Sequence, residues 1–324
     1  MICDQSLEWA KRHLLKYGGS DVFPPSEHYN ALSSNWDEIK TSILNLNYQS
    51  YAPKAPYLAF AEKQDGTYRA VHELDPYDAL IITAAIYELS TDIEQYRLPP
   101  ERHCVFSYRV NPQTDGSFFS RETENWKTFS SKRFELMQKY STGYVLKADI
   151  ADFFNQIYTH RIKNSLNEAS ESKREKLCNF IEEFLHGLNH KISKGIPVGP
   201  AFSIILAELT LNDLDRKVIS NGYEFVRWVD DYFIFAKSYK ELKILLLDMS
   251  AFLYGTQRWS GLFGQATGVY KWESALGSRS CRSLFLRLCV EVNHSRCLPV
   301  KVIMPSLFVV ELEVAGKSVF HLRH

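Results

Sequence analysis

Residues 144–154 (YVLKADIADFF) and residues 225–236 (FVRWVDDYFIFA) decide the fold. Each segment is a run of β-forming apolar residues marked by aspartate. Asp149 follows the first run, and Asp230 and Asp231 divide the second run into two halves. The first pattern predicts a buried strand, and the second predicts a β-hairpin with two aspartates at its tip.

The sequence around these two segments alternates between helical and strand patterns. Apolar spacing predicts helices over residues 5–17, 27–47, 75–95, 202–219 and 240–254, and two polar-faced helices within 160–190. Hairpins are predicted over residues 57–72 and 103–120. This order predicts an α/β (α+β) fold in which helices cover one face of a sheet.

The composition is that of an ordinary globular protein. The 324 residues are 45% hydrophobic, 14% aromatic and 23% charged, which excludes a disordered or low-complexity chain. No apolar run reaches the roughly 18 residues of a membrane span, and Asp4 and Glu8 interrupt the start where a signal peptide is apolar. We therefore expect a cytoplasmic protein with no membrane partner. The formal net charge of zero does not by itself indicate a nucleic-acid partner.

Two features of the C-terminal part stand apart. Cys281, Cys289 and Cys297 recur evenly near His294, but the short ligand spacings of a zinc site are missing, so scattered thiols are the favoured interpretation. Residues 256–324 contain no aspartate and show neither helical nor strand periodicity. Our hypothesis is that they form an atypical tail, divergent, truncated or frameshifted.

The aspartates carry the chemical prediction. Singly, each of Asp149, Asp230 and Asp231 also fits a turn or a helix cap. Together, two strand ends can bring them to one sheet edge, where carboxylate oxygens suit Mg²⁺. Close carboxylates repel one another, which cations relieve. Two metals about 4 Å apart would activate a 3′-hydroxyl and stabilise leaving pyrophosphate, which indicates nucleotidyl transfer.

Three segments resemble motifs A, B and C of reverse transcriptases: YVLKADIADFFNQI, GIPVGPAFSIILAEL and FVRWVDDYFIF. Upstream, the hairpin with Arg69, the DPYDAL helix and VFSYRV resemble the fingers of that family, so the likeness covers roughly residues 50–250. The Pro-Val-Gly-Pro form of motif B and the SYR segment are most similar to bacterial abortive-infection and defence-associated reverse transcriptases.

The resemblance implies a right-hand polymerase fold with fingers and palm and an absent or atypical thumb. The implied domains are an N-terminal helical segment (1–48), fingers (49–143), a palm with the three motifs (144–255) and the atypical tail (256–324). A helical insertion is expected at about 160–192.

The resemblance also implies roles for single residues in the palm. Asp149, Asp230 and Asp231 match the catalytic carboxylates that bind two Mg²⁺ ions, with Mn²⁺ as an alternative, and the backbone carbonyl of Ile150 would be a further ligand. Lys271 is a weak candidate for the general-acid lysine of the family.

Further residues match the nucleotide site of the family. Phe154 matches the steric gate against a ribose 2′-hydroxyl, although it could instead pack in the core, since Phe153 would alternate with it on the strand. Arg109 and Arg69 resemble residues that hold the triphosphate through bidentate hydrogen bonds, with a surface arginine as the alternative for Arg109. Gly199 would let the backbone approach the nucleotide closely.

The expected function is RNA-directed DNA polymerase activity in antiphage defence. The implied partners are an RNA template, deoxynucleoside triphosphates, and a DNA or RNA primer or a protein hydroxyl that primes. Two alternatives are a retron- or intron-type mobile-element reverse transcriptase and a catalytically inactive nucleic-acid-binding remnant. The sequence gives no oligomeric state.

Overall fold

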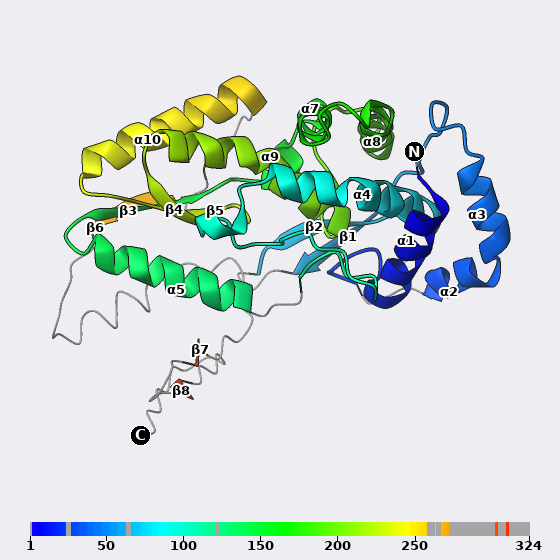
Figure 1. Ribbon diagram of the computed structural model, residues 1–324, viewed down its shortest axis with the longest axis horizontal. Coiled ribbons are helices and arrows are strands. Elements are labelled where there is room, and N and C mark those ends of the chain that lie inside the picture. Colours follow the sequence, from blue (N-terminus) through cyan, green and yellow to red (C-terminus); the bar gives the residue numbers. More distant parts are fainter. Residues whose placement is uncertain are drawn as a thin grey trace. The chain divides into compact units, whose positions relative to one another are not determined.

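In a computed structural model of the chain, the two aspartate-bearing segments pair within one antiparallel sheet (Figure 1). Its strand order is β4 (Glu224–Trp228), β5 (Asp231–Ala236), β3 (Tyr144–Asp149) and β6 (Gly268–Lys271). The central strands β3 and β5 are nearly continuous runs of buried residues. The predicted strand and hairpin therefore form, and a short strand from the expected tail, β6, extends the sheet.

The structure describes residues 2–23, 27–62, 66–120, 124–257, 263, 267–271, 302–303 and 309–310. They divide into two units, one of residues 1–59 and 70–274 and one of residues 60–69 and 275–324. The first unit contains the four-stranded sheet. The second contains β7 (Val302–Ile303) paired with β8 (Val309–Val310). The predicted cluster of cysteines near His294 lies outside the described residues.

Helices make up most of the first unit. They are α1 (Asp4–Tyr17), α2 (Glu27–Ser34), α3 (Trp36–Leu44), α4 (Pro76–Tyr96), α5 (Glu124–Lys139), α6 (Phe153–Gln156), α7 (Thr159–Ala169), α8 (Glu175–Leu188), α9 (Ala201–Ser220) and α10 (Tyr239–Phe252). Short helical turns follow at η1 (Pro100–Arg102) and η2 (Leu253–Gln257), and β1 (Tyr57–Glu62) pairs with β2 (Tyr68–Glu73). None of the described helices is long and apolar enough to cross a membrane.

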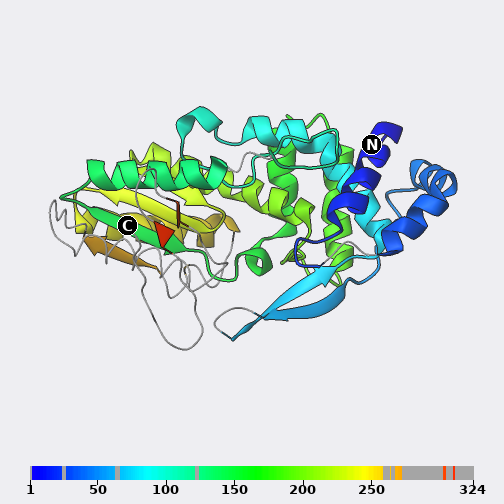
Figure 2. The ribbon, with the colours of Figure 1, turned by 90° about the horizontal axis from the view of Figure 1, so that it is seen from below.

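Helices pack on both faces of the sheet, whereas the sequence predicted helices on one face. Tyr232 of β5 donates a hydrogen bond to Asp215 of α9 at 2.7 Å, while the next residue, Phe233, has its ring 6.1 Å from that of Phe129 on α5. Successive strand residues point to opposite faces, so α9 and α5 lie on opposite sides. Figure 2 shows α5 running along the strands.

Three other local predictions need correction. The single helix expected over 27–47 is two helices, because the chain leaves helical geometry at Asn35. The hairpin expected over 103–120 is reduced to isolated bridges, including Val110 with Phe119. The strand expected to continue to Phe154 ends at Asp149, and α6 follows after Asp152 adopts a left-handed conformation with φ 51°.

The N-terminal helix is fastened to a distant loop. Trp9 of α1 donates from Nε1 to the carbonyl of Gln113 at 2.8 Å, and Nδ1 of His13 lies 2.8 Å from the carbonyl oxygen of Gly116. A carbonyl only accepts, so Nδ1 of His13 carries a hydrogen. Gly116 has φ +93°, and a Cβ there would lie 2.7 Å from the backbone nitrogen of His13, so only glycine fits this contact.

Burial of His13 makes the contact between α1 and the loop at Gly116 sensitive to pH. Desolvation lowers the pKa of His13 to about 4, although its hydrogen bond to Gly116 opposes the shift. The unfolded chain, with a pKa of about 6.5, binds the proton first. The stability contributed by neutral His13 is therefore complete above about pH 6.5 and is lost as the pH falls towards 4. We expect His13 alone to lower the free energy of unfolding by roughly 2 kcal/mol between pH 7 and pH 5.

Urea unfolding at both pH values measures this effect. His13→Asn keeps a donor for Gly116 but cannot titrate, so its unfolding free energy should change less between the two pH values than that of wild type. His103→Asn is the matched control, because His103 is exposed. Equal pH dependence in wild type and His13→Asn would contradict the assignment.

Candidate active site

The pairing of β3 with β5 places Asp149 directly opposite Asp231. Directly opposed residues of an antiparallel pair share one face of the sheet, with Cβ atoms about 5 Å apart. Asp149 and Asp231 are both partly exposed. The structure thus brings together two of the three predicted aspartates through backbone register alone.

Asp230 lies beside this pair in the two-residue turn between β4 and β5. Trp228 pairs with Asp231, which leaves Val229 and Asp230 as the turn. The backbone N–H of Ile150 donates to the carbonyl of Asp230 at 3.4 Å, so the chain that leaves β3 is joined to the turn. All three aspartates therefore lie at the same end of the sheet.

Thr267 is a neighbour of Asp149 that was not predicted. Its Oγ1 accepts a hydrogen bond from the backbone N–H of Asp149 at 3.1 Å and lies 3.4 Å from the Asp149 carbonyl oxygen, to which it donates. Thr267 precedes β6, so part of the expected atypical tail contacts the backbone at the candidate site. No local motif marks this threonine.

The donor atoms at this edge fit a magnesium ion. Carboxylate oxygens are hard ligands, and like charges directly opposite on a sheet repel each other, which a bound cation offsets. Within the described residues, however, no three Asp, Glu, His or Cys side chains are grouped closely enough to hold a metal ion. The three-carboxylate site, with the carbonyl of Ile150 as a further ligand, stays a prediction.

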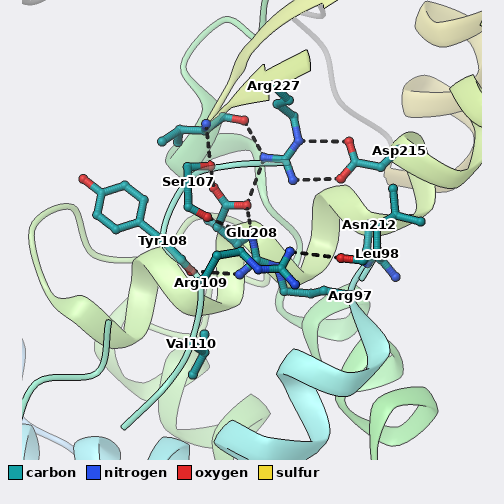
Figure 3. A network of polar contacts seen from close by, with 12 residues as sticks. Arg97, Leu98, Ser107, Tyr108, Arg109, Val110, Glu208, Asn212, Asp215 and Arg227 are labelled. Atoms are coloured by element: carbon teal, nitrogen blue, oxygen red, sulfur yellow. Dashed lines mark hydrogen bonds and ion pairs between the residues drawn. The ribbon is translucent and has the colours of Figure 1, made fainter. Parts of the chain in front are cut away.

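A buried ionic network lies behind the turn (Figure 3). Arg227 donates from Nε and Nη2 to the two carboxylate oxygens of Asp215 at 2.9 and 2.8 Å, and its Nη1 lies 3.0 Å from Glu208. Glu208 also accepts from Arg97 at 2.8 Å and from the Ser107 hydroxyl at 2.5 Å. All five side chains are almost completely buried.

The charges of this network balance. Burial by itself would lower the pKa of Arg227, but the carboxylates of Asp215 and Glu208 outweigh that effect and hold it well above its ordinary value. Arg227 is thus a permanent buried cation. Sequence reasoning missed the network, although its signal was present: Glu208 and Asp215 lie seven residues apart in an apolar helix, and Arg227 interrupts an apolar strand.

Arg109, predicted to hold a triphosphate, is engaged in internal contacts. Its Nη2 lies 2.5 Å from Glu94, its Nη1 donates to the carbonyl of Leu98 at 3.0 Å, and its side chain is only 11% exposed. Burial, followed by the nearby charge of Arg97, lowers the pKa of Arg109. These contacts give Arg109 a structural part, and nucleotide binding by it stays a prediction. Arg69 is half-buried on β2, within the second unit.

The prediction for Gly199 is a close approach of its backbone to the nucleotide. The close neighbour that the structure shows is protein, and contact with a nucleotide stays a prediction. Gly199 has φ +117°, and a Cβ there would lie 2.3 Å from the hydroxyl oxygen of Ser20. The Gly199 carbonyl accepts from the N–H of Asp21 at 3.1 Å. On the other side, the N–H of Val198 donates to Nδ1 of His72 at 3.2 Å. The Gly-Pro turn is therefore held between the N-terminal segment and β2.

Phe154 lies on the short helix α6 and is partly exposed, whereas Phe153 is buried. The centroids of the two rings lie 5.4 Å apart. Both residues are helical, so they do not alternate along a strand as predicted, but Phe154 does pack against the hydrophobic core, as the alternative interpretation expected. A role for Phe154 as a steric gate stays a prediction.

Lys271 does not lie near the aspartates. It pairs with Tyr144, at the opposite end of β3 from Asp149. Five strand residues span about 17 Å, which exceeds the length of a lysine side chain. Lys271 is therefore excluded as a general acid at this site.

The solved structures that are similar to this chain are remote from it in sequence. No curated protein sequence matches the chain. Among solved structures, apo telomerase from Candida tropicalis has 13% identity and a TM-score of 0.47, with 78% of this chain and 50% of that chain covered. Telomerase from Candida albicans in complex with a TWJ fragment of telomeric RNA has 11% identity and a TM-score of 0.44, with 78% and 48% covered. The chain thus spans about half the length of these structures.

The sequence model of the reverse transcriptase (RNA-dependent DNA polymerase) family matches residues 61–257, more than half of the chain. This range contains all three motif segments and both strands that carry the aspartates. The expected polymerase fold is confirmed, whereas the abortive-infection subgroup stays a prediction. The chain belongs to the reverse transcriptase family.

Proposed function

We propose that this chain synthesises DNA on an RNA template by adding deoxynucleotides to a 3′-hydroxyl. The observation that carries the proposal is the register that sets Asp149 opposite Asp231 within the family-matched range. Two acidic side chains at one sheet edge, with a third in the adjoining turn, suit divalent cations, which can in turn bind phosphates.

In this proposal Asp149, Asp230 and Asp231 hold two Mg²⁺ ions, or Mn²⁺, and the carbonyl of Ile150 adds a ligand. The bound ions would activate the attacking hydroxyl and stabilise the leaving pyrophosphate. The chain itself contributes the rigid backbone that keeps the carboxylates at one edge. Their mutual repulsion opposes close approach, and a bound cation offsets that repulsion.

The proposed nucleotide site uses Phe154 on α6, which limits bulk at the sugar and so favours deoxyribose. A role for Arg69 in holding the triphosphate is proposed from the family resemblance alone. Arg109 and Gly199 support the site by holding their segments in place through Glu94 and Ser20. The proposed substrates are deoxynucleoside triphosphates, with an RNA template and a DNA, RNA or protein primer.

Loss of one carboxylate tests the proposal. Asp230→Asn should reduce Mg²⁺-dependent incorporation of labelled deoxynucleotides by at least about a hundredfold, since a neutral amide is a poor ligand for a hard cation. RNA-primed, DNA-primed and primer-free reactions on an RNA template measure it and also identify the priming mode.

Asp248→Asn is the matched control for this assay. It removes the same charge from a surface ion pair between Asp248 on α10 and Lys217 on α9. It should retain wild-type incorporation. Equal activity of Asp230→Asn and wild type would contradict the proposed site. Folded wild-type protein that makes no product in any of the reactions would favour the inactive nucleic-acid-binding remnant.

The gate is tested through sugar selectivity. Phe154→Ala removes the bulk that opposes a 2′-hydroxyl, so the ratio of ribonucleotide to deoxynucleotide incorporation should rise by about tenfold or more. Competition between labelled dNTP and rNTP gives this ratio. Phe153→Leu is the matched control, because Phe153 is buried beside it. An unchanged ratio in Phe154→Ala would remove the gate assignment.

We further propose a role in antiphage defence, which rests on the resemblance of the Pro-Val-Gly-Pro and SYR segments. Bacteria that express wild-type protein should show fewer plaques for some phages of a panel than bacteria that express Asp230→Asn at equal level. Identical plaque counts across the panel would contradict this role and favour a mobile-element enzyme.

A further inference from the structure

The turn that carries Asp230 has an unfavourable backbone. Val229, its first residue, has φ +52°, the left-handed region. Two-residue hairpins that need a positive φ at this position normally use glycine. A β-branched residue in this conformation costs roughly 1–3 kcal/mol and persists only where its surroundings hold it.

Both backbone polar groups of Val229 are held by the buried network. Its N–H donates to the hydroxyl of Ser107 at 2.9 Å, and its carbonyl accepts from Nη1 of Arg227 at 2.7 Å. Ser107 and Arg227 are both 0% exposed. These contacts lie one residue before Asp230 and two before Asp231.

The two holding residues are themselves fixed. The Ser107 hydroxyl donates to Glu208 at 2.5 Å, so its lone pairs face the N–H of Val229. Asp215 accepts two parallel hydrogen bonds from Arg227, and this geometry restricts the orientation of the Arg227 guanidinium. Glu208 and Asp215 both lie on α9, which follows the Gly-Pro turn. The helix thereby fixes the shape of the aspartate-bearing turn.

We propose that Ser107 and Arg227 are positioning residues that hold the left-handed turn at Val229 and so set the placement of Asp230 and Asp231. The inference rests on the proposed function of those aspartates. It gives the SYR segment a structural role: Ser107 holds the backbone of the proposed metal-binding turn through the N–H of Val229 and does not contact substrate.

Ser107→Ala is the decisive variant, because it removes one oxygen and leaves every charge of the network paired. A shift of the turn should lower kcat for deoxynucleotide incorporation about ten- to a hundredfold and raise the Mg²⁺ concentration for half-maximal rate. The KM for deoxynucleotide should stay near the wild-type value. Ser90→Ala, another buried serine, which bonds only within α4, is the matched control and should keep wild-type kcat.

Val229→Gly supplies the rescue. Glycine adopts a positive φ without strain, so the turn no longer depends on Ser107. In the Val229→Gly background, Ser107→Ala should therefore cost less than threefold in kcat. An equal loss in both backgrounds would overturn the inference. If Ser107→Ala alone does not fold, recovery of folding in the double variant supports the inference, and failure to recover refutes it.

A readout independent of activity separates this inference from the proposed function. Hydrogen–deuterium exchange of the peptide that spans the β4–β5 turn should be faster in Ser107→Ala than in wild type and Ser90→Ala. Unchanged exchange would overturn the inference even if the enzyme is active. Faster exchange in a protein whose wild type shows no Mg²⁺-dependent synthesis would support the inference on the turn and refute the proposed function.

Discussion

The antiparallel register between β3 and β5 is the constraint on which the candidate site depends. Side chains alternate between faces with a period of two, so a slip of one residue would send Asp149 and Asp231 to opposite faces of the sheet. The register is held by apolar neighbours on both faces, among them Leu146 opposite Ile234 and Val145 opposite Phe235. Since α9 and α5 pack on the two faces, either direction of slip would disrupt a packed surface. The forces that build the core therefore also fix which carboxylates face each other.

The buried ionic network adds a second kind of constraint. Burying two guanidinium groups and two carboxylates is costly, and apolar residues of similar volume often stabilise a fold as well or better. Apolar residues could not bind the N–H and carbonyl of Val229, however. In this protein the network joins α9, the segment of residues 103–110 and the β4–β5 hairpin through directional contacts, and fully satisfied networks of this kind favour one arrangement of the backbone. Without these contacts, nothing in the network would hold Val229 in its unfavourable left-handed conformation.

The sequence predicted those parts of the site whose signals are local. Asp149, Asp230 and Asp231 could be assigned to strand ends because aspartate interrupts apolar runs there. The need for glycine at position 199 was also visible, but its neighbour was not, since Ser20 lies far away along the chain and nothing near Gly199 identifies it. Arg109 was predicted to bind phosphate. Its ion pair with Glu94 could not be predicted, because that contact depends on how α4 packs against the segment that follows it.

The parts that escaped prediction depend on packing between distant segments. The apolar residues of 103–120 predicted a hairpin, but Val105 forms an isolated bridge with Arg227 instead, and the segment lines the buried network. The Trp228 ring packs edge-on against that of Trp126, with the ring centroids 4.9 Å apart. Helix α5, which supplies Trp126, has apolar residues at helical spacing (Phe129, Leu136 and Met137), but the buried Arg133 interrupts that face, and its place on the sheet depends on contacts with distant strands.

The central claim is that three aspartates at one end of this sheet jointly bind divalent cations. Titration of the full chain with Mn²⁺, followed by electron paramagnetic resonance of the free ion, measures this without any substrate. The account predicts binding by wild type and Asp248→Asn, and affinity weakened about tenfold or more in each of Asp149→Asn, Asp230→Asn and Asp231→Asn. Identical Mn²⁺ binding curves for wild type and these three variants would contradict it.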